Sequence, residues 1–301
     1  MSAGGAPVNK TELTELFCSI GFHPSPKLGQ NFLIDPNMRR AIVDAAGLTR
    51  DDVVLEIGPG AGALTGLLCE RAVAVVAVEL DRTLFEILEE HLSGIPNLTL
   101  LQGDAVARHR AINPAVVEAL QDRLVESPGR RLKVVSNLPY SASTPAIVAL
   151  MTGGLPVALM ILTVQKEIAD RIAAAPGTKD YGLLSVTVQS GAEVTLLRKL
   201  PPEVFWPRPK VSSAVIEIRP RAELMNRIRD KKTFSDATHI LFTHRRKTVS
   251  NCFKTAGQFD LGVDAAGLFA HCGINPGLRG EALTVDQIIL LANTAFEWKR
   301  R

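Results

Sequence analysis

Short apolar runs, separated by glycine, proline and charged residues, recur along the first two thirds of the chain. These runs are too short for a typical helix and too apolar for an exposed strand, so they suit inner strands of a parallel sheet. The two last runs are predicted to be antiparallel strands. Strands are predicted at residues 53–57, 73–78, 98–102, 134–137, 158–164, 192–200 and 213–219.

Helix signals lie between these strands. Asp35 followed by Pro36 predicts a capped helix that ends near Gly47. From Arg221 onward the pattern is helical throughout, so we predict an α/β domain at 1–220 and a small all-helical domain at 221–301. Further helices are predicted at 11–20, 63–71 and 165–174, and after the capping pairs Asn113-Pro114 and Thr144-Pro145.

One predicted strand runs into the tetrapeptide Asn137, Leu138, Pro139 and Tyr140. Open α/β sheets keep their sites at the carboxyl ends of their strands. The Asn137 carbonyl and the proline-fixed carbonyl of Leu138 could accept the two amino hydrogens of an adenine, and Tyr140 could stack on the base. The alternative is an ordinary Asn-x-Pro turn.

A glycine-rich turn follows the first sheet strand. Gly58 and Gly60 allow a close backbone approach to a ligand at a helix N-terminus, and Glu79 at the end of the next strand can reach two ribose hydroxyls. Because Gly58-x-Gly60-x-x-Ala63 also fits the dinucleotide fingerprint, NAD, S-adenosylmethionine and a plain turn all remain open. Asp104 at a third strand end could bind the amino group of a cofactor adenine or simply cap a helix.

A second aromatic loop lies between the two late strands. Pro207 and Pro209 forbid a helix there and predict an extended loop that could hold Phe205 over a flat substrate. The chain has only two Tyr and two Trp, so the occurrence of Tyr140 and Trp206 in loop motifs argues against random placement. Core packing is the alternative role for Phe205.

Composition excludes several classes of protein. The length of 301 residues suggests about two domains, and the four cysteines are too dispersed for a disulfide framework or a zinc site. The six histidines also lack metal-ligand spacing, so we expect no metal. No apolar stretch approaches the roughly 20 residues of a membrane span, and the polar start, residues 1–10, lacks a signal-peptide core. A cytoplasmic protein is expected.

Positive charge is concentrated late in the chain. Residues 221–254 contain nine Lys/Arg and three Asp/Glu, so this window carries +6 and the rest of the chain carries −3. The cluster Arg245, Arg246 and Lys247 is therefore a candidate for contact with nucleic-acid phosphates. A solvated helix face is the alternative.

These motifs occur together in one order, and in this combination the chain closely resembles the small-subunit ribosomal RNA adenine-N6 dimethyltransferases from about residue 27 to 283. The matching segments are Gln30-Asn31-Phe32-Leu33, Glu56-x-Gly58-x-Gly60, Glu79, Gly103-Asp104, Asn137-Leu138-Pro139-Tyr140, Phe205-x-Pro207-x-Pro209-Lys210-Val211 and Arg245-Arg246-Lys247-Thr248.

The resemblance implies a Rossmann-type methyltransferase sheet that binds S-adenosylmethionine, with a helical C-terminal domain that binds RNA. It implies methyl transfer to adjacent adenines near the 3′ end of small-subunit (16S) ribosomal RNA, in a pre-30S particle, by a protein that we expect to be monomeric. Tyr140 and Phe205 would sandwich the flipped adenine. The residues implied to contact the cofactor are Asn31, Leu33, Gly58, Gly60, Glu79, Asp104 and Asn137.

Three rival functions remain at the level of sequence. An NAD oxidoreductase would use the glycine loop but would leave the tetrapeptide unexplained. A large-subunit adenine methylase that confers macrolide resistance would use similar chemistry. A ribosome-assembly factor could bind RNA without catalysis.

Overall fold

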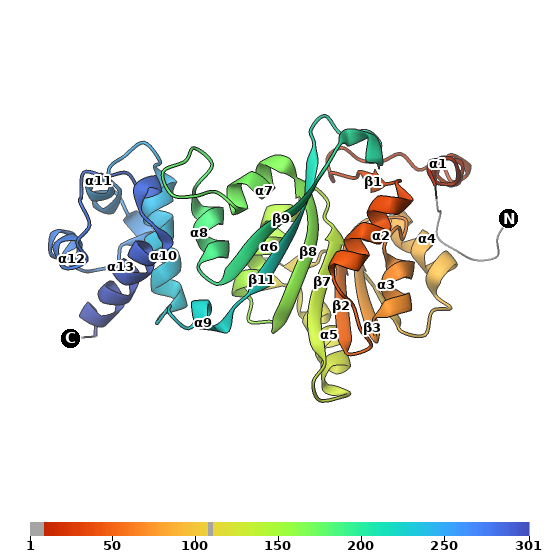
Figure 1. The fold of residues 1–301 in the computed structure, drawn as a ribbon, viewed down its shortest axis with the longest axis horizontal. Coiled ribbons are helices and arrows are strands. Elements are labelled where there is room, and N and C mark those ends of the chain that lie inside the picture. The colour runs from red at the N-terminus through yellow and green to blue at the C-terminus, as the bar shows by residue number, and fades with distance from the viewer. Residues whose placement is uncertain (1–8, 108–110, 301) are drawn as a thin grey trace. The chain divides into compact units, whose positions relative to one another are not determined.

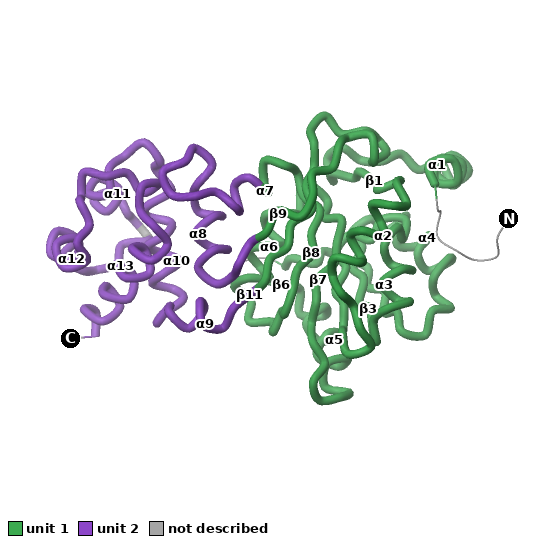
Figure 2. Tube along the Cα trace, in the orientation of Figure 1, with its two compact units in different colours: residues 1–169, 195–219 green, residues 170–194, 220–301 purple. Residues whose placement is uncertain are grey.

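A computed structural model of the protein describes residues 9–107 and 111–300 (Figure 1). Most of the predicted polar start lies outside the described residues. The chain divides into two compact units, one running up to residue 169 together with 195–219, and the other comprising 170–194 and 220–301 (Figure 2). Within the described residues, no helix is long and apolar enough to cross a membrane.

A seven-stranded sheet forms the centre of the first unit, with strand order β4-β3-β2-β7-β8-β11-β9. The first five strands in this order are parallel to their neighbours, whereas β11 is antiparallel to β8. This confirms the predicted α/β sheet of Rossmann type. The strands are β2 (Asp52–Ile57), β3 (Ala74–Glu79), β4 (Leu98–Gln102), β7 (Arg131–Asn137), β8 (Val157–Gln165), β9 (Ala192–Leu200) and β11 (Ser213–Pro220).

Helices cover both faces of this sheet. Alternate strand residues point to opposite faces, so Val54 joins a buried cluster with α2 and α3, while Val53 and Leu55 face the other side. There α5 contacts β2 and β3. The helices that begin in this unit are α1 (Lys10–Ser19), α2 (Pro36–Ala45), α3 (Thr65–Arg71), α4 (Arg82–Leu92), α5 (Pro114–Val125), α6 (Ser143–Thr152) and α7 (Lys166–Ile172).

Two short strand pairs lie outside the main sheet. Strand β1 (Phe32–Leu33) pairs with β10 (Phe205–Trp206), just after the single-turn helix η2 (Pro202–Val204). Strand β5 (Val106–Ala107) pairs with β6 (Ala111–Ile112). Neither pair was predicted, because two-residue strands leave no periodic signal.

Local signals place most helices correctly. Asp35 caps α2 as predicted, and its carboxylate accepts hydrogen bonds from two backbone amides of the first turn. The predicted Thr144 cap is wrong, because α6 already begins at Ser143 and has no side-chain cap. Helix α4 was not predicted, although Asp81 caps it through backbone amides of the first turn.

The described part of the second unit contains helices, the start of β9 and the last residue of β11. Its core joins residues of α8 (Leu183–Gln189) to the C-terminal helices, so residues 170–194 group with 220–301 rather than with the sheet that precedes them. The predicted roles of the two domains, catalysis for 1–220 and RNA binding for 221–301, stay predictions. The other elements are α9 (Ala222–Met225), α10 (Lys231–Thr243), α11 (Val249–Lys254), η3 (Gly257–Phe259), α12 (Ala265–His271), η4 (Gly280–Ala282) and α13 (Val285–Trp298).

Candidate active site

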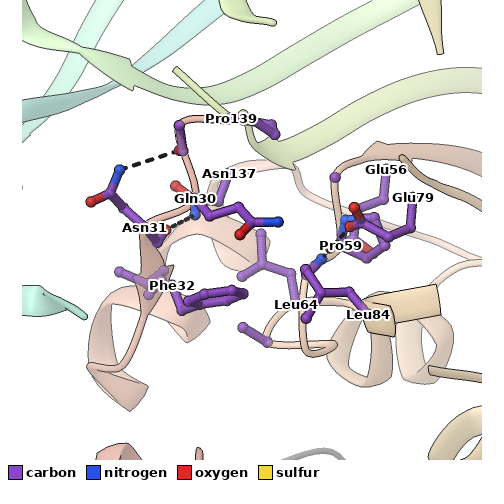
Figure 3. A pocket seen from close by; sticks show the side chains of 15 residues that line it. Gln30, Asn31, Phe32, Glu56, Pro59, Leu64, Glu79, Leu84, Asn137 and Pro139 are labelled. Atoms are coloured by element: carbon purple, nitrogen blue, oxygen red, sulfur yellow. Dashed lines mark hydrogen bonds between the residues drawn. The ribbon is translucent and has the colours of Figure 1, made fainter. Parts of the chain in front are cut away.

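Two adjoining hollows open at the carboxyl ends of β2, β3 and β7. They share Gln30, Gly58, Glu79 and Pro139, so they form one continuous site. Figure 3 shows the first hollow with Gln30 and Asn31 on one side and Glu56 and Glu79 on the other. The lining combines apolar side chains with a few amide and carboxylate groups, as sites for small ligands do.

The glycine loop and the tetrapeptide touch directly. Gly58 has φ +69°, and a Cβ added there would lie 2.6 Å from Cγ of Pro139. Gly60 has φ +62°, and its Cβ would lie 3.0 Å from the ring of Phe32. Both positions therefore need glycine for conformation and for space. The sequence predicted the close approach of a ligand here, and the structure adds the close approach of two protein segments.

Glu79 ends β3 beneath the glycine loop. One carboxylate oxygen accepts a hydrogen bond from Gly60 N at 2.9 Å, and the other accepts one from Asp81 N at 2.9 Å. Burial raises the pKa of Glu79 to about 7, although those backbone amides oppose the shift. Each carboxylate oxygen keeps a second lone pair, which is the acceptor that a ribose hydroxyl needs.

A second acid, Glu56, was not among the predicted site residues. It lies in β2, is 1% exposed and lines the same hollow. Burial raises the pKa of Glu56 to about 8; the nearby Glu79 adds to the shift and the Thr65 hydroxyl opposes it. An acidic residue inside an apolar strand was the signal in the sequence, because strands of this kind rarely bury a charge without a function.

The Asn137 side chain is held by the segment that carries Asn31. Its amide nitrogen donates to the backbone carbonyl of Asn31 at 3.0 Å, which fixes the plane of the amide. No described residue donates a hydrogen bond to the Asn137 side-chain carbonyl. The next residue, Leu138, donates its backbone N–H to Thr163 at 3.1 Å. The tetrapeptide is thus anchored on both sides while one amide oxygen keeps its acceptor capacity.

The two predicted aromatic residues lie in different surroundings. Tyr140 is partly buried, and its hydroxyl shares a 2.7 Å hydrogen bond with Ser213. Burial raises the pKa of Tyr140. Phe205 is only 2% exposed and packs in a buried cluster with Leu33 and Val215. Its stacking role stays a prediction, and the structure as it stands places the ring in the core.

Asp104 and Leu33 reach the site in different ways. Asp104 is exposed, lines the second hollow, and accepts a hydrogen bond from Val106 N at 2.9 Å. This is a local turn contact rather than a helix cap. Leu33 is 1% exposed and lines the first hollow.

Gln30 lines both hollows, although the sequence analysis assigned it no role beyond its place in the Gln30-Asn31-Phe32-Leu33 motif. Its amide nitrogen donates to the Asp81 carboxylate at 2.9 Å, and its carbonyl accepts from Ser25 N at 2.7 Å. The segment before β1 is thereby fastened to the start of α4. Side-chain reach across a fold leaves no periodic signal, so this contact could not be predicted.

The three residues of the basic cluster, Arg245, Arg246 and Lys247, differ in how strongly they contact the rest of the second unit. The Arg245 guanidinium donates to the backbone carbonyls of Lys179 and Tyr181 at 2.7 and 2.8 Å, and it lies 3.4 Å from the Glu281 carboxylate. Arg246 is exposed, and the Lys247 ammonium makes only a 3.4 Å contact with Thr255.

Comparison with known proteins identifies a family and close relatives of this chain. The family described as ribosomal RNA adenine dimethylase matches residues 21–295. The chain is 40% identical over 272 residues to the protein named "Ribosomal RNA small subunit methyltransferase A" of Halothermothrix orenii, which covers 89% of this chain and 86% of that protein. The protein of the same name from Alkaliphilus oremlandii is 40% identical over 277 residues and covers 90% and 92%.

Solved structures share the fold. A dimethyladenosine transferase from Plasmodium falciparum matches with a TM-score of 0.70 at 23% identity, and covers 89% of this chain and 98% of that one. The 23S rRNA methyltransferase ErmE matches with a TM-score of 0.59 at 24% identity, and covers 87% and 98%. At these identities the likeness concerns the fold alone.

The sheet order and the glycine-lined hollow are those of a Rossmann-type methyltransferase. More specifically, the chain belongs to the ribosomal RNA adenine dimethylase family. This is a family of enzymes that take their methyl group from S-adenosylmethionine. Membership confirms the predicted class of enzyme and favours it over the NAD oxidoreductase and the non-catalytic assembly factor.

Proposed function

We propose that this protein uses S-adenosylmethionine to convert adenines of small-subunit ribosomal RNA to N6,N6-dimethyladenine. The observation that carries the proposal is the Asn137 amide, which is pinned by Asn31 beside the glycine-lined hollow and keeps its carbonyl available. The relatives at 40% identity are named as small-subunit enzymes, and this favours the small subunit over the large one.

The hollow has the donor and acceptor groups that S-adenosylmethionine requires. We assign the ribose to Glu79, whose buried carboxylate has remaining lone pairs, and the backbone approach to Gly58 and Gly60. S-adenosylmethionine supplies an electrophilic methyl group on a sulfonium. The remaining assigned contacts, to the cofactor adenine and methionine moieties, are those of Asn31, Leu33, Asp104 and Asn137.

Activation of the adenine is assigned to the tetrapeptide. The adenine amino group is a weak nucleophile because its lone pair is delocalised into the ring. Hydrogen bonds from this group to the Asn137 side-chain carbonyl and the Leu138 backbone carbonyl would favour a pyramidal nitrogen, and Pro139 fixes that backbone. Holding the amine in line with the methyl supplies much of the acceleration. Each methyl transfer releases one proton from the nitrogen, which can pass to solvent. In a second round the methylated nitrogen keeps one hydrogen, so one of the two carbonyls would accept it while the pocket admits the methyl group.

Base stacking is assigned to Tyr140 and, after local opening of the loop, to Phe205. Extruding a base costs a few kcal/mol, and stacking on an aromatic ring is worth roughly 1 to 3 kcal/mol. The hydrogen bond to Ser213 holds the Tyr140 ring by its hydroxyl, and the partly buried side chain is the one we assign to stack on the base. Phe205 requires the opening because it is buried in the structure.

RNA binding is assigned to Arg246 and Lys247 together with Arg245. Arg279 is exposed, and its backbone pairs with that of Thr248, the residue after Lys247. Its positive charge therefore adds to that of the cluster. We propose that the natural substrate is a pre-30S particle in the cytoplasm and that the enzyme acts as a monomer. Arg245 has the weakest claim to an RNA contact, because its guanidinium already binds protein carbonyls.

The test is methyl transfer from labelled S-adenosylmethionine to small subunits purified from cells that lack this protein. We expect labelled dimethyladenine near the 3′ end of the small-subunit RNA, identified by mass spectrometry of nuclease digests. Large subunits from the same cells serve as the matched control. Label on the large subunit alone would favour the resistance methylase, and no label on either would overturn the proposed function.

A further inference from the structure

An aromatic cluster beneath helix α1 joins the two halves of the candidate site. Phe17 is 1% exposed, and its ring centroid lies 4.6 Å from Phe22, 5.1 Å from Phe32 and 5.8 Å from Trp206. The pairs with Phe22 and Phe32 are edge-to-face, the arrangement that aromatic rings prefer. Figure 1 shows α1 beside β1, in agreement with these contacts.

One partner of Phe17 belongs to the cofactor side of the site. The Phe32 ring lines the first hollow and closes on Gly60 of the glycine loop. Ala61 of that loop and Leu84 of α4 lie in the same buried cluster as Phe17. The inner face of α1 therefore packs on residues that surround the hollow rather than on the central sheet.

The other partner belongs to the substrate side. Trp206 follows Phe205 directly, and β1–β10 pairing sets Phe32 opposite Trp206 and Leu33 opposite Phe205. A further hydrogen bond, from Ile34 N to Val204 O at 2.9 Å, extends this pairing by one residue. A shift of β1 at the cofactor hollow must consequently move the loop that carries Phe205.

We infer that Phe17 is a positioning residue that holds the glycine loop and the Phe205 loop in one register, so that cofactor and target base are aligned with each other. The inference rests on the proposed function. Phe17 touches neither reactant; it acts through Phe32 on one side and Trp206 on the other. An ordinary core residue would affect stability alone, whereas a residue that bridges both loops must affect cofactor affinity and the transfer step together.

The test compares the full-length variants Phe17→Ala, Phe17→Leu and Leu120→Ala. Leu120 of α5 is fully buried, and α5 packs on β2 and β3, so Leu120→Ala supplies a comparable loss of core packing away from the cluster. The measurements are S-adenosylmethionine affinity by calorimetry, single-turnover methyl transfer at saturating cofactor, small-subunit binding, and thermal unfolding as a check that each variant is folded.

For Phe17→Ala we expect cofactor affinity to fall about tenfold and single-turnover transfer to fall about tenfold or more, because small misplacements of reactants are costly. Small-subunit binding should stay at the wild-type level, since it depends on the other unit. Phe17→Leu refills the space and should restore both quantities to within about threefold, and Leu120→Ala should change neither.

Two results would overturn the inference. One is a folded Phe17→Ala enzyme that transfers methyl at the wild-type rate with wild-type cofactor affinity. The other is an equal loss in Phe17→Ala and Leu120→Ala, which would mean that Phe17 serves stability only. A wild-type enzyme without activity on small subunits would instead overturn the proposed function, so the two failures are distinguishable.

Discussion

The two buried acids of the hollow are the residues whose chemistry depends most on their surroundings. Glu56 and Glu79 are both almost fully buried, and burial raises the pKa of each carboxyl. The charge of Glu79 raises the pKa of Glu56 further. Two charged carboxylates so close together are unfavourable unless a cation or hydrogen-bond donors compensate them. S-adenosylmethionine carries both kinds of group, so ligand binding and deprotonation should be coupled.

The first prediction concerns the pH dependence of cofactor binding. In the proposed role of Glu79, its charged form accepts hydrogen bonds from the ribose hydroxyls. Because burial raises the pKa of Glu79 to about 7, cofactor affinity should increase as pH rises from 6 to 8. One group with this pKa gives a change of about tenfold over that interval. Calorimetry at the two pH values measures it. Glu79→Gln is the control and should bind weakly at both; equal wild-type affinities would contradict the assignment.

The second prediction concerns stability without cofactor, and its sign is opposite. A carboxyl whose pKa is raised on folding contributes stability that is fully present below its ordinary value of 4.5 and is lost as pH rises through the folded value. For Glu56 that value is about 8, so the free energy of unfolding should decrease between pH 5 and pH 8. Urea unfolding of wild type and Glu56→Gln tests this: the variant should lose much of the slope, and an unchanged slope would exclude Glu56 as its source.

The third prediction isolates the Asn137 acceptor. Asn137→Ala should abolish single-turnover methyl transfer at saturating cofactor while small-subunit binding stays nearly intact, because phosphate contacts dominate that binding. Asn137→Asp keeps an acceptor of similar shape and should retain some transfer. If alanine supports the wild-type rate, the tetrapeptide is only a turn, and the mechanism proposed above is wrong.

At the scale of elements, the loop between α10 and α11 divides its positive charges between two tasks. Arg245 fastens this loop to the segment around Lys179 and to Glu281, whereas Arg246 and Lys247 make few contacts with protein. Arg227 of the window also has an acidic partner outside it, since it pairs with Asp286. The charge counted along the sequence therefore overstates the charge available to RNA.

The fourth prediction follows from that division. The double change of Arg246 and Lys247 to Ala should weaken small-subunit binding and flatten its dependence on salt, with the logarithmic slope falling by up to about 2. Arg245→Ala should mainly lower thermal stability. Lys231 and Lys232, at the other end of α10 and about 18 Å away by helix rise, provide a charge-matched control. An equal loss of slope in that control would mean a diffuse charge effect.

Element types could be predicted wherever one segment carries its own signal. The run before Asn137 and the Asp35-Pro36 cap were read correctly because burial and capping are local. Helix α4 was missed although its Asp81 cap and buried Leu84 are present in the sequence. The β1–β10 pair could not be predicted, because its partners are distant in sequence and each strand has only two residues.

The candidate site was predictable as a set of motifs, and its internal contacts were not. Glycines and acids at strand ends point to a ligand because such ends converge in a parallel sheet. The Asn137 bond to Asn31 and the burial of Phe205 arise from tertiary packing, which leaves no pattern along the chain. Glu56 was within reach of sequence reasoning, since a charged residue in a buried strand is itself a signal.

At the scale of the whole molecule, the units do not follow chain order. Residues 170–194 lie between strands of the sheet in sequence, yet Tyr181 and Val186 are buried in the core of the helical unit. The Tyr181 ring packs edge-to-face on Phe242 at 5.9 Å. The chain therefore enters the second unit, returns to complete the sheet, and enters the second unit again.

The fifth prediction tests this arrangement by truncation. A fragment of residues 1–220 loses Phe242 and the rest of that core, so Tyr181 and Val186 become exposed. We expect such a fragment to bind a hydrophobic dye and to be cleaved rapidly by protease within 170–194. A fragment that resists protease there as well as the full chain does would show that this segment folds with the sheet alone.

The contact between Gly58 and Pro139 has a consequence for how such chains diverge. A Cβ at 58 would collide with the proline ring, and φ of +69° penalises any other residue there even if the ring were removed. A change at 139 therefore cannot release position 58, whereas a change at 58 must disturb 139. Position 139 should therefore tolerate substitution better than position 58. Related chains should vary the proline of the tetrapeptide more often than the glycine.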